Sequence, residues 1–320
     1  MIKPVLAIHG GAGAISRAKT TPELRQQYEA ALTQILESAG AMLAQGATAV
    51  DTVAEAVRLL EECPLFNAGH GAVFTSEGKH ELDASIMDGA SLDSGAVANV
   101  TIVRNPVLAA RAVMENSAHV FFVGEGAENF ARNHGLELVD PGFFSTPARR
   151  EQLEQVQRSG SGEMLLDHDA QALSFAPLDE RRKLGTVGAV ALDSHGNLAA
   201  ATSTGGMTNK QPGRVGDAPL VGAGCYANNR SCAVSTTGTG EAFIRLVAAH
   251  DVSAQMEYAG ASLVDAAASV VHEKLPKIGG SGGLIAVDAQ GQVTMPFNTE
   301  GMYRGYIYPG QAPFVAIHAQ

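Results

Sequence analysis

Apolar residues recur at steps of three and four in two stretches near the start of the chain, a spacing typical of amphipathic helices. The first predicted helix begins at Thr20 or Thr21, whose hydroxyl suits a helix N-cap, and it ends at Gly46. The second runs from about Val50 to Cys63. Shorter stretches of the same kind predict helices at residues 107–116, 126–134, 241–250 and 263–275.

Short apolar runs bounded by turn residues predict strands, and two pairs of runs predict hairpins at residues 187–203 and 284–297. A run at 5–8 predicts a buried strand that enters a glycine-rich turn at 9–13. Hairpins imply an antiparallel or mixed sheet rather than a purely parallel one. Two sheets covered by helices on both sides would account for this order of elements.

A polar stretch of roughly thirty residues begins at about residue 151 and runs to residue 184, which is unusual inside a compact domain. It ends at Gly185–Thr186, directly before the core strand at 187–192. A cut between Gly185 and Thr186 would leave Thr186 with a free α-amine and a hydroxyl. Such a residue carries a base and a nucleophile together.

Composition excludes several classes of protein. The chain has 320 residues, of which 45% are hydrophobic and 17% charged, enough for one large domain or two ordinary ones. A net charge of −11 without a long Lys/Arg run argues against nucleic acid as a partner. The three cysteines have no C-x-x-C spacing, and no apolar stretch is long enough to span a membrane. The N-terminal apolar run is too short for a signal peptide, so we expect a cytoplasmic protein.

Two short motifs point to other enzyme classes but lack the surrounding pattern. The G-x-G-x-x-A run at 222–227 has no strong strand before it and no helix opening after it, so a tight turn explains it better than a dinucleotide site. Ser281 lies in G-x-S-x-G, and Asp288 and His318 follow in the order of an α/β-hydrolase. Too few residues follow Ser281 for that fold.

Two further segments suit a site for a small anionic or zwitterionic molecule. In residues 236–241, a strand gives way to a glycine-rich turn and a helix, where the backbone N–H groups near Gly238 and the Thr237 hydroxyl could form an oxyanion hole. The same turn could be purely structural. Arg214 and Asp217 lie three residues apart in a tight loop; they could form a salt bridge only, or bind a carboxylate and an ammonium.

Several long motifs in this order resemble the plant-type (type III) L-asparaginase/isoaspartyl peptidase family of N-terminal nucleophile hydrolases, especially its bacterial isoaspartyl dipeptidases. The motifs lie at residues 9–13, 67–71, 185–191, 201–206, 212–217 and 237–241, so the resemblance covers almost the whole chain. It implies an α+β fold, a four-layer αββα sandwich. It also implies autocleavage into an α chain (1–185, with 151–185 as a mobile linker) and a β chain (186–320) that together form one domain.

The resemblance also implies roles for individual residues. Thr186 would be the nucleophile with its own α-amine as the base, and Thr204 would orient it. Thr237 and Gly238 would form the oxyanion hole. Arg214 would bind the substrate carboxylate and Asp217 the ammonium, with Gly240 close by, and Asn67 would support the cleavage region. Backbone carbonyls would bind a structural sodium ion, those of Leu60, Glu61, Cys63, Phe66, Ala68 and His70.

The implied function is hydrolysis of β-aspartyl (isoaspartyl) dipeptides and of L-asparagine, without an organic cofactor, by a homodimer of αβ units. A glycosylasparaginase acting on GlcNAc-asparagine shares this chemistry but usually works in lysosomes or the periplasm. A non-catalytic binding protein with the same fold is a third possibility. The chain departs from the family pattern at Ala218, where serine is usual after Asp217.

Overall fold

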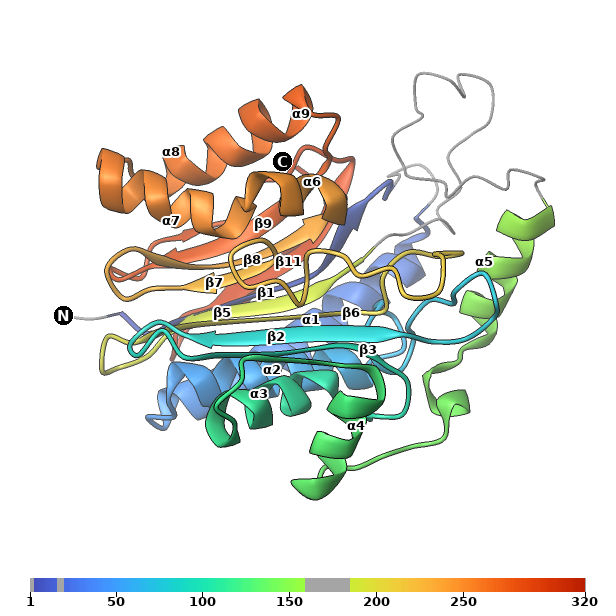
Figure 1. Ribbon diagram of the computed structural model, residues 1–320. Coiled ribbons are helices and arrows are strands. Elements are labelled where there is room, and N and C mark those ends of the chain that lie inside the picture. Colours follow the sequence, from blue (N-terminus) through green and yellow to red (C-terminus); the bar gives the residue numbers. More distant parts are fainter. Residues whose placement is uncertain (1–2, 16–19, 159–184, 320) are drawn as a thin grey trace.

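The computed structural model describes residues 3–15, 20–158 and 185–319. Figure 1 shows four layers, in which two sheets lie face to face and helices cover the outer face of each. The larger sheet has the strand order β12 (Phe314–Ala316), β11 (Gly301–Ile307), β1 (Val5–Gly13), β5 (Val187–Leu192), β6 (Leu198–Thr204), β2 (Leu82–Asp88), β3 (Ser94–Val100) and β4 (Phe121–Val123). The smaller sheet has the order β10 (Val293–Thr294), β9 (Gly282–Asp288), β8 (Cys232–Gly238) and β7 (Cys225–Ala227). The expected αββα sandwich of the α+β class is confirmed.

Two long helices behind the larger sheet begin where the sequence predicts. The Thr21 hydroxyl accepts the amide of Leu24 at 3.2 Å and caps α1 (Pro22–Ala44). The Thr48 hydroxyl caps α2 (Ala49–Glu62) in the same way. The predicted helices α3 (Pro106–Asn116) and α4 (Gly124–Asn133) and both hairpins, β5–β6 and β9–β10, are also present.

The structure corrects four expectations. Residues 9–13 continue strand β1 instead of forming a turn, because β11 pairs with them, with a bulge between His9 and Gly11 (φ 115°). Helix α5 (Pro147–Arg158) occupies the start of the polar stretch, and residues 159–184 lie outside the described residues. Val247, with a left-handed backbone, divides the predicted helix at 241–250 into α6 (Gly240–Leu246) and α7 (Ala248–Ala259). The helix at 263–275 is α8 (Leu263–Ala268) followed by a π-helical turn and α9 (Leu275–Lys277).

Strand β5 is buried on both faces and therefore shows an apolar run without alternation. Val187, Ala189 and Ala191 pack in the core beneath α1–α3, whereas Val190 and Leu192 pack in the core between the sheets. With a side-chain period of two, Gly188 also faces the smaller sheet, where a Cβ would lie 1.9 Å from Ser235 Oγ. The same alternation directs Thr186 toward the smaller sheet.

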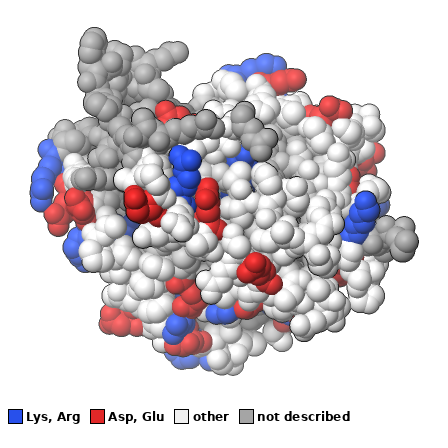
Figure 2. Space-filling model, turned by 180° about the vertical axis from the view of Figure 1, so that it is seen from behind, with Lys and Arg blue, Asp and Glu red and all other residues white. Residues whose placement is uncertain are grey.

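Seen from behind, the surface carries acidic and basic side chains in small interspersed groups (Figure 2). In the part of the chain that the structure describes, no helix is both long and apolar enough to cross a bilayer.

Candidate active site

Thr186 lies immediately before β5 and is buried, with 8% of its surface exposed. Because Val187 pairs with Ser203 across the β5–β6 hairpin, Thr186 comes beside Thr204 at the end of β6. The Thr186 hydroxyl donates to Thr204 Oγ1 at 3.3 Å, and the Thr186 amide donates to Thr237 Oγ1 at 3.3 Å. The three predicted catalytic threonines therefore meet at one end of the two sheets.

Thr237 and Gly238 end strand β8, on the smaller sheet. The Thr237 hydroxyl also accepts the amide of Ala12 at 3.2 Å, so it connects β8 to β1 as well as to Thr186. Gly238 has φ 147°, and a Cβ there would lie 2.2 Å from the carbonyl oxygen of Ser281. Strand β9 therefore approaches so closely that only glycine fits, and the backbone beside Thr186 carries no side chain.

Arg214 and Asp217 come together around Gly240, where a Cβ would lie 2.9 Å from Arg214 Nη2 and 2.9 Å from Asp217 Oδ1. Arg214 does not pair with Asp217; its guanidinium donates two bonds of 2.9 Å to the Glu241 carboxylate. Asp217 instead accepts the Thr236 hydroxyl at 2.6 Å. The loop therefore holds the Arg214 guanidinium and the Asp217 carboxyl without a bond between them. Both lie beside Gly240, and Asp217 contacts Thr236, the residue before Thr237.

The Asp217 carboxyl is almost completely enclosed. Burial raises its pKa, while the hydrogen bond from Thr236 and the nearby charge of Arg214 lower it by less. An ammonium group bound against this carboxyl would favour its ionised form. The site is thus chemically suited to a ligand that brings its own positive charge.

Asn67 braces the chain on the other side of Thr204. Its Nδ2 donates to the Gly206 carbonyl at 2.7 Å, and its Oδ1 accepts the amide of Val73 at 2.9 Å. The Gly206 amide in turn donates to Thr204 Oγ1 at 3.0 Å. A Cβ on Gly185 would lie 3.8 Å from Asn67 Cβ, so Asn67 also adjoins the bond before Thr186.

Comparison with known proteins identifies the family of the chain. The family model described as asparaginase matches residues 2–317. The chain belongs to the asparaginase family. It is 63% identical over 320 residues to the isoaspartyl peptidase of Salmonella typhimurium, with 100% of both chains covered. It is 62% identical to the isoaspartyl peptidase of Escherichia coli (100% and 98% covered) and 40% identical to a probable isoaspartyl peptidase/L-asparaginase of Arabidopsis thaliana (94% of each).

The segment from Leu60 to His70 folds back on itself, and the Glu61 carbonyl accepts the amide of His70 at 2.7 Å. A Cβ on Gly71 would lie 2.7 Å from the carbonyl oxygens of both Pro64 and Phe66, and one on Gly69 would lie 2.4 Å from that of Glu61. Within the described ranges, no group of three or more His, Cys, Asp or Glu side chains could hold a metal ion. A cation here would therefore depend on main-chain oxygens, the ligands suited to a hard ion.

The Glu61 side chain connects this segment to the catalytic strand. It is fully buried, and burial raises its pKa to about 8. Its Oε1 accepts the Ser203 hydroxyl at 2.6 Å and the amide of Val107 at 3.0 Å. Since Ser203 precedes Thr204 on β6, this hydrogen bond connects the segment to the strand that carries Thr204.

His9 is a buried neighbour of the site to which the sequence analysis assigned no role. His9 Nε2 lies 2.8 Å from Ser235 Oγ, which lies 2.7 Å from Thr202 Oγ1. Thr202 uses its only proton on the Gly224 carbonyl, so Ser235 must donate to Thr202 and accept from His9. Burial lowers the pKa of His9 to about 3, against a smaller upward effect of the Thr186 backbone. The imidazole is therefore neutral, with its proton on Nε2.

This shift predicts a specific loss of stability in acid. Between about pH 6.5 and pH 3 the unfolded chain binds a proton at His9 and the folded chain does not. The contribution of His9 is therefore complete above pH 6.5 and falls by about 1.4 kcal/mol for each pH unit below it. We expect His9→Gln, made in an uncleaved Thr186→Ala background, to show a shallower decline in urea unfolding free energy from pH 7 to pH 4. Parallel curves for the two proteins would contradict the shift.

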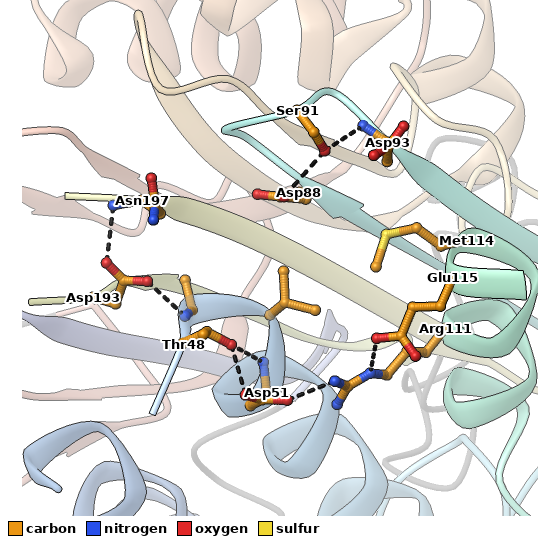
Figure 3. A pocket seen from close by; sticks show the side chains of 12 residues that line it. Thr48, Asp51, Asp88, Ser91, Asp93, Arg111, Met114, Glu115, Asp193 and Asn197 are labelled. Atoms are coloured by element: carbon orange, nitrogen blue, oxygen red, sulfur yellow. Dashed lines mark hydrogen bonds and ion pairs between the residues drawn. The ribbon is translucent and has the colours of Figure 1, made fainter. Parts of the chain in front are cut away.

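A separate hollow of about 480 Å³ lies at the other end of β5, on the order of 20 Å along that strand from Thr186 (Figure 3). Arg111, the basic side chain that lines it, bonds to Asp51 at 2.5 Å and to Glu115 at 2.7 Å. The Asp193 carboxylate accepts a hydrogen bond from the amide of Ala49 at 3.0 Å. None of the predicted site residues lines this hollow, so it is not the active site.

Proposed function

We propose that the chain is a self-processing threonine hydrolase that releases L-aspartate from β-aspartyl dipeptides and from L-asparagine. One observation carries the proposal: the Thr186 hydroxyl lies against Thr204, and the Thr186 nitrogen lies against Thr237, at the start of a core strand. In the proposed roles, the nucleophile, its amine and an oxyanion donor would belong to one hydrogen-bonded group. The names of the bacterial relatives, isoaspartyl peptidases, support the same activity.

Self-processing would begin with attack of Thr186 Oγ1 on the carbonyl carbon of Gly185. The acyl group moves from the nitrogen to the hydroxyl oxygen of Thr186, and water hydrolyses the resulting ester. The products are the Gly185 carboxylate and a Thr186 with a free α-amine. Thr204, which accepts a hydrogen bond from the Thr186 hydroxyl, orients that hydroxyl for the attack.

In the mature enzyme, the α-amine of Thr186 would act as the base. Its ordinary pKa of roughly 7.7–8.0 leaves a useful fraction unprotonated near neutral pH. The amine takes the hydroxyl proton as Oγ1 attacks the side-chain carbonyl of the substrate, and Thr237 and Gly238 stabilise the oxyanion. The amine then passes the proton to the leaving nitrogen, and water hydrolyses the aspartyl ester.

The loop beside Gly240 supplies the specificity for an aspartyl group. Arg214 would bind the α-carboxylate with two parallel bonds, and Asp217 would bind the α-ammonium. Both groups are free only when the aspartyl residue is linked through its side chain. Glu241, which now holds the guanidinium, would keep Arg214 in place and share it with the substrate.

A panel of substrates tests this function. We expect the purified, cleaved protein to release aspartate from β-aspartyl-leucine and from L-asparagine. It should leave α-aspartyl-leucine untouched, because that peptide has no free α-carboxylate on its aspartyl residue. Ion chromatography of the products would measure each rate. Faster hydrolysis of GlcNAc-asparagine than of every β-aspartyl substrate would instead indicate a glycosylasparaginase, and no hydrolysis at all would indicate a binding protein.

The structural metal in this proposal is a sodium ion bound by main-chain oxygens of the segment from Leu60 to His70. The convergence of carbonyls on Gly69 and Gly71 supports it. Bound sodium would hold together the segment that carries Asn67 and Glu61. The midpoint of thermal unfolding should rise more with sodium chloride than with choline chloride. An equal rise with both salts would count against the ion.

The assembly in this proposal is a homodimer of αβ units in the cytoplasm. Apolar side chains are exposed near the edge strand β4, including Val120 and Val123 at 60% each, and a second copy could cover them. Cys63, Cys225 and Cys232 are free, as expected of a reducing compartment. Light scattering that gives the mass of a single αβ unit would contradict the dimer.

A further inference from the structure

Arg149 on α5 is a half-buried arginine whose guanidinium meets no carboxylate among the described residues. Its Nε donates to the Gly71 carbonyl at 2.7 Å, and one terminal nitrogen donates to Gln152 Oε1 at 3.1 Å. Burial lowers the pKa of the group. By contrast, Arg104, Arg111 and Arg214 each hold one or two acidic side chains. A partly desolvated cation with no carboxylate partner among the described residues can bind an anion.

Arg149 lies close to the bond that is proposed to be cleaved, beside Gly185. Arg149 and Gly185 line the same small hollow of about 10 Å³, about the space of one water molecule. The other lining residues are Gly10, Tyr28, Leu65, Phe66, Asn67 and Tyr303. Gly185 is bonded directly to the nitrogen of Thr186. Arg149 therefore lies beside Gly185, the residue that occupies the space next to this nitrogen before cleavage.

The proposed reaction places the leaving group in that same space. The α-amine of Thr186 must pass its proton to the leaving nitrogen, so the two nitrogens must come within hydrogen-bonding distance. Cleavage frees the side of the Thr186 nitrogen on which Gly185 lies. The departing half of the substrate would then occupy the place that Gly185 leaves, with Arg149 beside it. In a β-aspartyl dipeptide, this half is an amino acid with a free carboxylate.

We propose that Arg149 binds the free carboxylate of the leaving amino acid and makes the enzyme selective for β-aspartyl dipeptides. The inference rests on the proposed function, since it concerns the leaving half of that substrate. L-Asparagine releases ammonia and has no such carboxylate, and a longer peptide carries an amide at this point. Arg149 is thus a specificity residue for the leaving amino acid, whereas Arg214 binds the carboxylate of the aspartyl half.

The walls of the hollow indicate which side chains would accompany the carboxylate. Tyr28 and Tyr303 stack at 4.2 Å between ring centroids, and Phe66 meets Tyr28 edge-on at 5.7 Å. A Cβ on Gly10 would lie 2.3 Å from the Phe66 ring, so the backbone of β1 closes against this group. An aromatic wall favours apolar leaving residues such as leucine over acidic ones.

Three substrates and two variants test the proposal. Fully cleaved wild-type protein, Arg149→Met and Arg149→Lys are compared on β-aspartyl-leucine, on β-aspartyl-leucine amide and on L-asparagine. Wild type should prefer the free acid over the amide by about 10- to 100-fold in kcat/KM, and Arg149→Met should lose most of this preference. Arg149→Lys should keep part of it. The ratio of dipeptide to asparagine kcat/KM should fall by a similar factor in Arg149→Met.

Arg150→Met is the matched control, because Arg150 is the exposed neighbour on the same helix and lies over the Phe74 ring at 5.0 Å. It should leave both ratios as in wild type. Equal losses on dipeptide and asparagine in Arg149→Met would overturn the proposal, as would a wild type that hydrolyses the acid and the amide equally. The second comparison needs no variant, so it can overturn the proposal even if Arg149→Met fails to cleave, and Arg149→Lys then reports on the role of Arg149. Absence of all hydrolysis by wild type would instead refute the proposed function.

Discussion

Thr186→Ala is expected to leave a single uncleaved chain without hydrolytic activity. Alanine removes the hydroxyl that attacks Gly185, so the bond before residue 186 stays intact and no α-amine is freed. Activity should therefore fall by at least about 10³-fold, the scale on which nucleophile deletions act. Denaturing electrophoresis would follow cleavage, and aspartate release from β-aspartyl-leucine would follow activity.

Thr186→Ser is the matched control for this change. Serine keeps the hydroxyl and loses only the methyl group, so cleavage and activity should both persist, although more slowly. A Thr186→Ala chain that is still cut before residue 186, or that still releases aspartate, would place the nucleophile elsewhere. A Thr186→Ser chain as inert as Thr186→Ala would show that packing of the methyl group, rather than the hydroxyl, is decisive.

Arg214→Ala is expected to cost substrate binding far more than self-processing. Its guanidinium is the group proposed to hold the α-carboxylate, and removing a charged, two-bonded partner typically lowers kcat/KM by about 10²–10³-fold. Cleavage should proceed, because the bond before Thr186 contacts Thr237 and Asn67 rather than Arg214. Kinetics on β-aspartyl-leucine and a time course of cleavage would be measured on the same preparation.

Arg245→Ala provides the comparison for Arg214, since Arg245 is exposed on the same short helix as Glu241. It should process and hydrolyse as wild type does. If Arg214→Ala slowed cleavage as strongly as it slowed hydrolysis, Arg214 would act on folding of the site through Glu241. Its role as a substrate-binding residue would then have to be abandoned.

Local patterns in the sequence were sufficient to predict most of the helices and both hairpins. Thr21 and Thr48 cap α1 and α2 through contacts three residues away, so their signals lie within a short window. The strand at residues 9–13 was mistaken for a turn because its partner β11 lies near the other end of the chain. Glycine favours turns locally, but pairing with β11 fixes the conformation of these residues here.

The candidate site could be predicted from the sequence only in part, for a similar reason. Motif order indicated Thr186, Thr204 and Thr237, yet the contact between Thr186 and Thr237 joins residues from two different sheets. No spacing rule predicts such a contact. Glu241 was not predicted as a site residue, because its pairing with Arg214 depends on how the loop folds over Gly240. Arg149 lay just before the polar stretch and had no motif of its own.

The central claim is that activity appears only when the chain frees the amine of Thr186. The most direct measurement follows freshly made protein over time, by intact mass and N-terminal sequencing on one side and aspartate release on the other. We expect two fragments, 1–185 and 186–320, and an activity that rises in proportion to the new N-terminal Thr186. Full activity in an intact chain, or a cut at any other bond, would contradict it.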